Sequence, residues 1–364
     1  GVWIMAYTTI DDPSAHHQTA FYTGNATQRN ITNDGNSDLQ PDWVWIKSVS
    51  ALESNMLYDT SRGVTKDLRS GGTAAENTNA QGLQAFNSDG FQLGTLQNVN
   101  YNSQTLVAWQ WKANGGTLTT NDASATSIGT HDSQFQANTT AGFSIVTWTG
   151  NAEPETIAHG LGATPDMIWI KNRADSEGWW VGSASAGSIS GGKYLLLHND
   201  NALATNSTSF VNQDPTSTVF RVGGSNSGAD NLINGNSDNM IAYCFTSIKG
   251  YSKIGSYTGN GNADGIFVYT GFKPAWLLWK RTDSATSWRV FDNKRDTDNV
   301  VKSRLFPDVT DAANTSQDTL DFLSNGFKLK STNSGGNASS GTYIYMAFAE
   351  HPFVSSKGVP VTAR

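Results

Sequence analysis

Three stretches of the chain share one pattern, a proline followed by a short apolar strand that ends in lysine: PDWVWIK at Pro41–Lys47, PDMIWIK at Pro165–Lys171 and PAWLLWK at Pro274–Lys280. A proline suits the first residue of a strand, because it has no N–H to donate to the sheet. In the first stretch, alternation places the two tryptophans and the lysine on one face and Val44 and Ile46 on the other. Apolar residues on both faces indicate a strand that is covered on both sides for part of its length.

Three further landmarks accompany this strand, always in the same order. An aromatic-Thr-Gly-Asn turn precedes it, with 15 to 17 residues between the turn glycine and the strand proline, and a Phe-centred strand and a strongly apolar strand follow it. The turns are Tyr22–Asn25, Trp148–Asn151 and Tyr257–Asn260; the Phe-centred strands are Asn87–Gly94, Ser217–Gly224 and Leu323–Lys330; the last strands are Thr105–Trp111, Met240–Phe245 and Tyr343–Ala349. The order and spacing predict three copies of one unit of about 100 residues.

The composition favours strands and turns. Only 15% of the 364 residues are charged, and Gly, Asn, Ser and Thr are abundant. Short apolar runs separated by Gly, Asn, Asp or Ser clusters are typical of sandwiches and barrels. We therefore expect an all-β protein made of three tandem antiparallel β-sandwich domains.

The repeat also predicts domain boundaries. The segment 114–142 is polar and poor in large apolar residues, which favours a linker or an extended arm, whereas the second and third copies join almost directly. We expect an N-terminal arm at 1–19, repeat 1 at 20–113, a linker at 114–142, repeat 2 at 143–250, repeat 3 at 251–350 and a C-terminal tail at 351–364.

Charge, hydropathy and cysteine content exclude several classes of protein. The net charge of −7, without a run of Lys or Arg, argues against a nucleic-acid partner. No apolar stretch is long enough to predict membrane insertion, and the first residues lack the pattern of a secretory signal. Cys244 is the one cysteine, so an intrachain disulfide is impossible, and its place in an apolar strand predicts a buried inert thiol.

The 12 tryptophans invite a search for a sugar-binding face, because indole rings stack well on sugars. Most belong to the repeated strands and are expected in the core. Trp179, Trp180 and Trp288 lie in less similar, polar surroundings and are the candidate ligand-binding residues. Packing in a core or between domains remains the alternative for these three, and the one that we favour.

Two Gly-containing loops carry the oxygen ligands that calcium prefers. Asp34 and Asp38 lie in the loop NDGNSD, and Asp264 lies in the loop NGNADG. Neither loop has the terminal Glu of a calcium-binding loop, and ordinary turns use the same residues. His16 and His17 have no partner at zinc-site spacing, which favours a solvated arm. We therefore predict no metal site.

The sequence also gives no sign of catalysis. It contains no GxSxG elbow, no HExxH and no P-loop. Glu153 and Glu155 are a carboxylate pair of the type that glycosidases use, but they lie in a turn-like stretch and do not recur in the other copies. We expect a protein that is not an enzyme, with no catalytic residues and no cofactor.

Several phrases resemble a known family. They are FSIVTWTGN at Phe143–Asn151, GYSKIGSYTGNGNADGIFVYTGFKPAWLLWKR at Gly250–Arg281 and GTYIYMAFAEHPF at Gly341–Phe353. They are similar to an uncharacterised β-sandwich domain that occurs in tandem in virion and tail-fibre-type proteins of bacteriophages, many of them marine and cyanobacterial phages. The resemblance implies sandwiches of a jelly-roll or lectin-like kind and a place on the virion. It supplies no catalytic or binding residues.

The expected function is that of a phage virion structural protein, such as a tail fibre, a tail-associated protein or a capsid-decorating protein. Its partners would be other virion proteins and further copies of itself, as a trimer in the case of a fibre. It would assemble in the host cytoplasm and be released by lysis. A carbohydrate-binding module that recognises host surface glycans is the alternative, and a glycan depolymerase is a third hypothesis.

Overall fold

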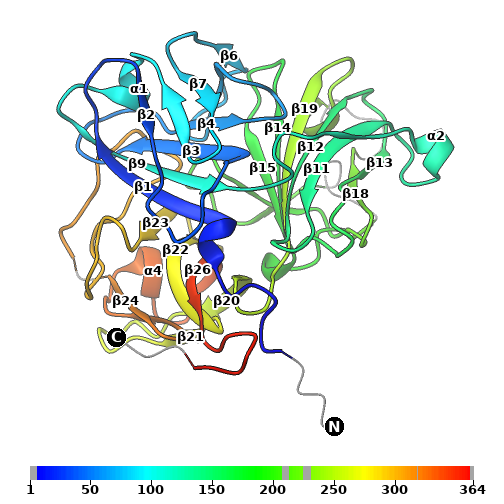
Figure 1. Cartoon of the computed structure of the whole chain (residues 1–364). Coiled ribbons are helices and arrows are strands. Elements are labelled where there is room, and N and C mark those ends of the chain that lie inside the picture. The colour runs from blue at the N-terminus through cyan, green and yellow to red at the C-terminus, as the bar shows by residue number, and fades with distance from the viewer. Residues whose placement is uncertain (1–5, 207–212, 224–230, 318, 361–364) are drawn as a thin grey trace.

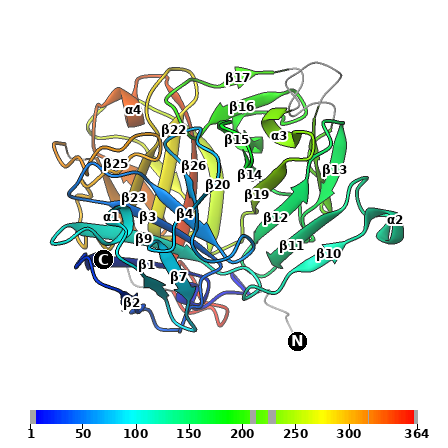
Figure 2. The same cartoon turned by 90° about the horizontal axis from the view of Figure 1, so that it is seen from above.

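Each of the three copies folds as two antiparallel sheets packed face to face, a larger one and a smaller one. The computed structural model describes residues 6–206, 213–223, 231–317 and 319–360. Within these ranges strands greatly outnumber helices, so the predicted all-β sandwich-like class is confirmed. Figure 1 and Figure 2 show the copies as three lobes around a common centre.

The first copy forms a six-stranded and a three-stranded sheet. In spatial order, the larger sheet contains β1 (His17–Thr23), β9 (Thr105–Trp111), β3 (Trp43–Ser48), β4 (Met56–Asp59), β5 (Lys66–Arg69) and β6 (Asn77–Thr78). The smaller sheet contains β2 (Arg29–Ile31), β8 (Phe91–Leu93) and β7 (Leu83–Phe86).

The second copy has the largest sheet, with eight strands. In spatial order they are β10 (Thr119–Asn121), β11 (Ser133–Asn138), β12 (Phe143–Thr149), β19 (Asn239–Phe245), β14 (Met167–Asn172), β15 (Trp179–Ser183), β16 (Lys193–Leu196) and β17 (Ala204–Thr205). The smaller sheet contains β13 (Glu155–Ala158) and β18 (Val219–Val222).

The third copy keeps the central strands of the same plan. Its larger sheet contains β20 (Ser252–Thr258), β26 (Thr342–Pro352), β22 (Phe272–Arg281) and β23 (Arg289–Asp292), and its smaller sheet contains β21 (Phe267–Tyr269), β25 (Gly326–Leu329) and β24 (Leu320–Leu323). The short helices of the described residues are η1 (Pro13–Ala15), α1 (Gln97–Asn100), α2 (Ala123–Thr126), η2 (Ala184–Ala186), α3 (Asn231–Asn234) and α4 (Ser334–Asn337). None of them has the length and apolar character to cross a membrane.

The repeated Pro-to-Lys strand is covered on both faces, as its sequence predicts. In β3, Val44 and Ile46 face the smaller sheet and pack with Phe91 and Leu93 in the sandwich core of the first copy. The opposite face carries tryptophans, and it packs against the other two copies.

The tryptophan faces of all three larger sheets meet in one shared core. Residues at equivalent positions of the repeated strand, Trp45, Trp169 and Leu278, all belong to it. Aromatic rings join each pair of copies: Trp43 and Tyr243 have ring centroids 4.7 Å apart, Trp111 and Trp276 5.3 Å, and Phe245 and Phe348 6.4 Å. The three sandwiches therefore pack into one compact body and are not separate domains joined only by linkers.

The lysine that ends each repeated strand joins neighbouring copies. Lys47, Lys171 and Lys280 are fully buried, and each ammonium group donates to backbone carbonyls. One acceptor in each set belongs to another copy: Thr310 O for Lys47 at 2.7 Å, Thr73 O for Lys171 at 3.2 Å and Asp200 O for Lys280 at 3.0 Å. The first copy thus binds the third, the second binds the first and the third binds the second, which closes a ring. Burial lowers the pKa of each of these lysines to about 8.

The Thr-Gly-Asn turn recurs because it fits against a short helix at close range. Any Cβ on the turn glycine would overlap a backbone carbonyl that follows the helix, as at Gly150, where Gly235 O lies in the way. The last helical residue is a buried asparagine in every copy. Its amide nitrogen donates to the carbonyl two residues beyond the turn, over 2.7 to 2.8 Å: Asn100 to Thr27, Asn234 to Glu153 and Asn337 to Asn262.

Three predicted boundaries are wrong. The segment 114–142 is not a linker, because β10 and β11 pair with each other and extend the sheet of the second copy beyond β12. The backbone N–H groups of Ala113, Gly115 and Gly116 also donate to the carboxylate of Asp42. The arm 1–19 contains η1 and the start of β1, and the tail 351–364 begins within β26. Polar composition misled the prediction, since edge strands need few large apolar residues.

Candidate functional site

A polar cavity of about 340 Å³ opens between the first and third copies. Its lining comes from η1, β1 and residues 34–36 of the first copy and from β22, β26 and residues 293–297 of the third. Figure 1 shows β1 beside β22 and β26. Residues far apart in the sequence meet here because the larger sheets of the two copies face the same centre.

Two buried polar groups on β1 line the cavity without a partner in the protein. His17 is 3% exposed and Thr19 is 5% exposed, and they lie on the same face of the strand, two residues apart. Neither the His17 Nε2 atom nor the Thr19 Oγ1 atom has a hydrogen-bond partner among the described residues. Leaving a buried polar atom unpaired costs about 1–3 kcal/mol, so such atoms in a native protein need an explanation.

The hydrogen bonding of His17 fixes what its free nitrogen can do. Burial lowers the pKa of the imidazole to about 3, so the ring is neutral near pH 7. Its Nδ1 atom lies 2.9 Å from Gln110 O, and a carbonyl only accepts, so Nδ1 carries the hydrogen. The Nε2 atom therefore keeps a bare lone pair, which can accept a hydrogen bond but is itself buried.

The sister copies carry different residues at these two positions. Counting back from the Thr of each turn, the equivalents of His17 and Thr19 are Phe143 and Ile145 in the second copy and Ser252 and Ile254 in the third. The Ser252 hydroxyl has partners, since it accepts from the N–H of Ile248 at 2.9 Å and donates to Thr246 O at 3.3 Å. The first copy alone places unpaired polar groups at this pair of positions.

β1 is the outer strand of its sheet, as β20 is in the third copy, whereas their counterpart β12 in the second copy is covered by β11. An edge position is therefore shared by two copies, and the first differs from the third in the residues at the positions of His17 and Thr19.

The ionised side chains around the cavity are already paired. The Asp12 carboxylate accepts from the hydroxyls of Ser14 and Ser37 at 2.6 and 2.7 Å. Glu350 forms an ion pair with Lys273 at 2.5 Å, and Asp34 forms one with Lys294 at 2.8 Å. The groups left to bind a ligand are neutral.

The ligand-binding prediction for the three tryptophans is wrong, because all of them are buried. Trp179 and Trp288 are fully buried in the shared core, and Trp180 is 6% exposed and packs against Tyr194 with centroids 4.2 Å apart. The indole nitrogen of Trp179 donates to Arg69 O and that of Trp288 to Leu196 O, both at 2.8 Å and both in a neighbouring copy. Packing in a core or between domains, the alternative favoured for these residues, is what the structure shows: Trp179 and Trp288 pack between copies and Trp180 packs in the core of the second copy.

Asn55 takes the corresponding position in the first copy. Trp179 pairs with Lys171, and continuing the strand registers by one residue sets Asn55 opposite Lys47 and Trp288 opposite Lys280. The amide nitrogen of Asn55 donates to the carbonyls of Phe306, Pro307 and Val309 in the third copy. A side-chain donor at this position thus joins neighbouring copies three times, with two different residue types.

The candidate calcium ligands lie apart from other acids. Asp34 pairs with Lys294, and Asp264 pairs with Lys328 at 2.5 Å, so an ammonium group lies where a cation would bind. Asp38 is exposed. Among the described residues, no three His, Cys, Asp or Glu side chains are grouped closely enough to hold a metal ion.

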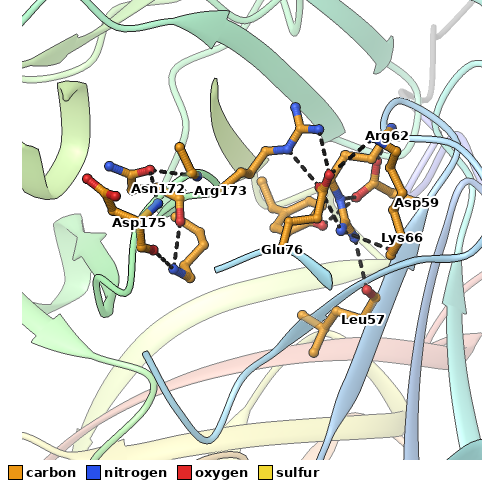
Figure 3. A network of polar contacts seen from close by, with 11 residues as sticks. Leu57, Asp59, Arg62, Lys66, Glu76, Asn172, Arg173 and Asp175 are labelled. Carbon is orange, nitrogen blue, oxygen red and sulfur yellow. Dashed lines mark hydrogen bonds and ion pairs between the residues drawn. The ribbon is translucent and has the colours of Figure 1, made fainter. Parts of the chain in front are cut away.

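A buried network of charges lies between the first two copies, and Figure 3 shows Glu76 between Arg62 and Arg173. Arg62 also pairs with Asp59 at 2.5 Å, and Tyr243 of the second copy donates to the same carboxylate at 2.7 Å. Buried charges of this kind are candidates for chemistry as well as for structure.

The third copy repeats part of that network, which favours structure. Asp292, the equivalent of Asp59, pairs with Arg295 at 2.6 Å and accepts from the Trp109 indole of the first copy at 3.0 Å. In the second copy the position is Ser183, and the side chain expected to face it is Phe348, which has no donor. The two carboxylates each have a donor from a neighbouring copy, and the copy without the carboxylate faces a side chain without a donor. This is expected of residues that pair across an interface.

The prediction that the Cys244 thiol is buried is confirmed. Cys244 is fully buried in β19 with a free thiol, and burial raises its pKa well above the usual range. Such a thiol is protonated and shielded at neutral pH.

Sequence reasoning missed the cavity and placed His17 in a solvated arm. The sequence does contain a signal of this difference. When the three turns are aligned, His17 and Thr19 are both polar, whereas the equivalent pairs in the other two copies are mainly apolar. A comparison limited to what the copies share hides positions, such as this pair, where they differ in chemistry.

A family model described as Domain of unknown function (DUF7483) matches residues 12–352. No curated protein and no solved structure matches the chain.

Proposed function

Because the chain belongs to the family of Domain of unknown function (DUF7483), which carries no activity to transfer, we propose its function from its structure and its resemblance to phage proteins. It is a structural component of a bacteriophage virion, such as a tail fibre, a tail-associated protein or a capsid-decorating protein. It holds three fused β-sandwiches at fixed angles and presents their outer surfaces for assembly and for contact with the host.

The observation that carries this proposal is what the copies have in common. The shared residues are the strand that fills the central core, the lysine that joins neighbouring copies, the glycine of the turn and the asparagine that ends the short helix. A unit duplicated for its chemistry would repeat reactive groups. This unit repeats packing and interface groups, which supports selection for shape.

Rigidity is a second support. Aromatic contacts and the hydrogen bonds of buried lysines join each pair of copies around the centre. Each copy is therefore held in place by contacts with both others. Particle proteins must keep their surfaces in register with their neighbours. Weak contacts with a cell surface also gain from being repeated, which favours assembly of several chains, as in a trimer.

Mass spectrometry of purified particles of a phage that encodes this chain tests the proposal. We expect the chain among the structural proteins, at a constant ratio to the other virion proteins after density-gradient purification. An antibody raised against the recombinant chain would locate it on the particle by electron microscopy. Absence of the chain from particles, with its presence in the lysate, would overturn the assignment.

Carbohydrate binding is a second candidate function, and one observation favours it. The cavity between β1 and β22 is lined by residues with unpaired neutral hydrogen-bonding groups. The equivalent residues of the sister copies are apolar or already have hydrogen-bond partners. This function is compatible with a virion role and does not depend on it.

A further inference from the structure

We propose that the cavity between the first and third copies binds a neutral polyhydroxyl ligand, a single saccharide unit of a glycan. His17 and Thr19 are its recognition groups. The inference deepens the carbohydrate-binding candidate and moves it from the buried tryptophans to a site that the sequence did not indicate.

The charge balance of the cavity favours a neutral ligand. Glu350 and Asp34 each form an ion pair with a lysine, whereas the Asp12 carboxylate accepts from the hydroxyls of Ser14 and Ser37. An anion would meet the negative charge of Asp12, and a cation would have to displace its hydroxyl donors or break an ion pair. A hydroxyl group needs only a free acceptor and a free donor.

The two unpaired groups supply that combination. His17 Nε2 accepts, and the Thr19 hydroxyl both donates and accepts. Residues two apart on one face of a strand are separated by about 6.6 Å, a span that one sugar ring with its hydroxyls can bridge. The amides of Asn36 and Asn293 in the cavity wall add further neutral groups of both kinds.

The size of the cavity also suits such a ligand. Small-molecule sites occupy about 300–1,000 Å³, and this cavity, at about 340 Å³, is near the lower end of that range. One sugar ring fits this space better than a long oligosaccharide.

The unpaired indole N–H groups of the shared core do not make the same case. The indole N–H groups of Trp43, Trp111, Trp169 and Trp276 also have no hydrogen-bond acceptor among the described residues. They lie in the closed aromatic core, and none of them lines the cavity. His17 and Thr19 differ from these tryptophans because they are residues that line the cavity.

The sister copies supply the variants for a test. Thr19→Ile introduces the residue found at Ile145 and Ile254, and His17→Phe introduces the residue found at Phe143. Both variants are therefore expected to fold, which thermal unfolding would check. Thr19→Ser keeps the hydroxyl, and Thr23→Ile makes the same apolar change on an exposed residue of the same strand, outside the cavity lining.

The experiment titrates the full chain with D-glucose, D-galactose, D-mannose, L-rhamnose and N-acetyl-D-glucosamine at millimolar concentrations. Saturation-transfer NMR follows the sugar, and ¹⁵N-labelled histidine reports on the His17 Nε2 atom. We expect at least one sugar to bind the wild type and to shift the Nε2 resonance. Thr19→Ile and His17→Phe should each weaken that binding at least about tenfold, whereas Thr19→Ser and Thr23→Ile should retain it.

Three outcomes would overturn the proposal. They are no shift of the His17 Nε2 resonance with any of these sugars, unchanged affinity of the folded Thr19→Ile variant, or displacement of a bound sugar by acetate or inorganic phosphate used as charged probes. None of these results bears on whether the chain is found in virions, so failure here is separate from failure of the structural role.

Discussion

Replacing Lys171 by methionine tests whether the buried ammonium groups hold the copies together. The Lys171 Nζ atom donates to Asn172 O at 2.6 Å, to Asp175 O at 3.2 Å and, in the first copy, to Thr73 O at 3.2 Å. Methionine keeps a flexible unbranched stem, so most packing of the strand is retained while the donor is lost.

The expected cost follows from the acceptors that lose their donor. An unpaired buried acceptor costs about 1–3 kcal/mol. Asn172 is fully buried, whereas Thr73 and Asp175 are exposed residues whose carbonyls can bind water instead. One full penalty and two partial ones predict a loss of about 2–4 kcal/mol in the free energy of unfolding.

Urea unfolding at pH 7, followed by tryptophan fluorescence and circular dichroism, measures this loss. The shared core predicts one cooperative transition for both proteins, with a lower midpoint for the variant. Lys193→Met is the matched control, since Lys193 is exposed in the same copy and should change the stability by less than about 0.5 kcal/mol. A loss in Lys171→Met no larger than that of the control, or separate transitions for separate lobes in the wild type, would refute the reasoning.

Three other predictions follow from single groups. Gly150→Ala should prevent folding or lower the unfolding midpoint strongly, because the new Cβ would overlap Gly235 O, whereas Gly72→Ala, with open space around it, should be tolerated; a soluble variant with wild-type stability would contradict this. The pKa of His17, about 3 in the folded chain, lies below its unfolded value of 6.5, so unfolding takes up a proton and stability falls as the pH drops from about 6 to 4. His17→Phe should remove about 1.4 kcal/mol per pH unit of that slope, and parallel slopes for the two proteins would refute it. The Cys244 thiol should react with a disulfide reagent only after denaturation, and fast reaction in the native protein would disprove its burial.

The predictions from sequence agree best with the structure where they depend only on the residue pattern within a single strand. The alternation in Trp43–Lys47 predicts two covered faces, and the structure places Val44 and Ile46 in one core and Trp43 and Trp45 in another. A period of two residues follows from the geometry of a single strand, so it can be seen without any knowledge of neighbours.

The prediction fails where the partner lies far away in the chain. Polar composition made 114–142 a linker, yet β11 hydrogen-bonds along β12 and covers it. Polar surroundings made Trp179 and Trp288 ligand candidates, yet each indole donates to a carbonyl about 90 to 110 residues away. Backbone carbonyls are the same in every residue, so no feature of the sequence marks which of them a side chain will reach.

By itself the sequence determined the all-β class, the three copies and the two-sided strand at the heart of each, because these depend on local order and on repetition along the chain. Only the tertiary structure decided that the copies share one core, that Lys47, Lys171 and Lys280 close a ring, and that His17 and Thr19 line a cavity. The physical reason is that burial and hydrogen-bond satisfaction belong to the surroundings of a group, and here those surroundings come from other copies of the repeat.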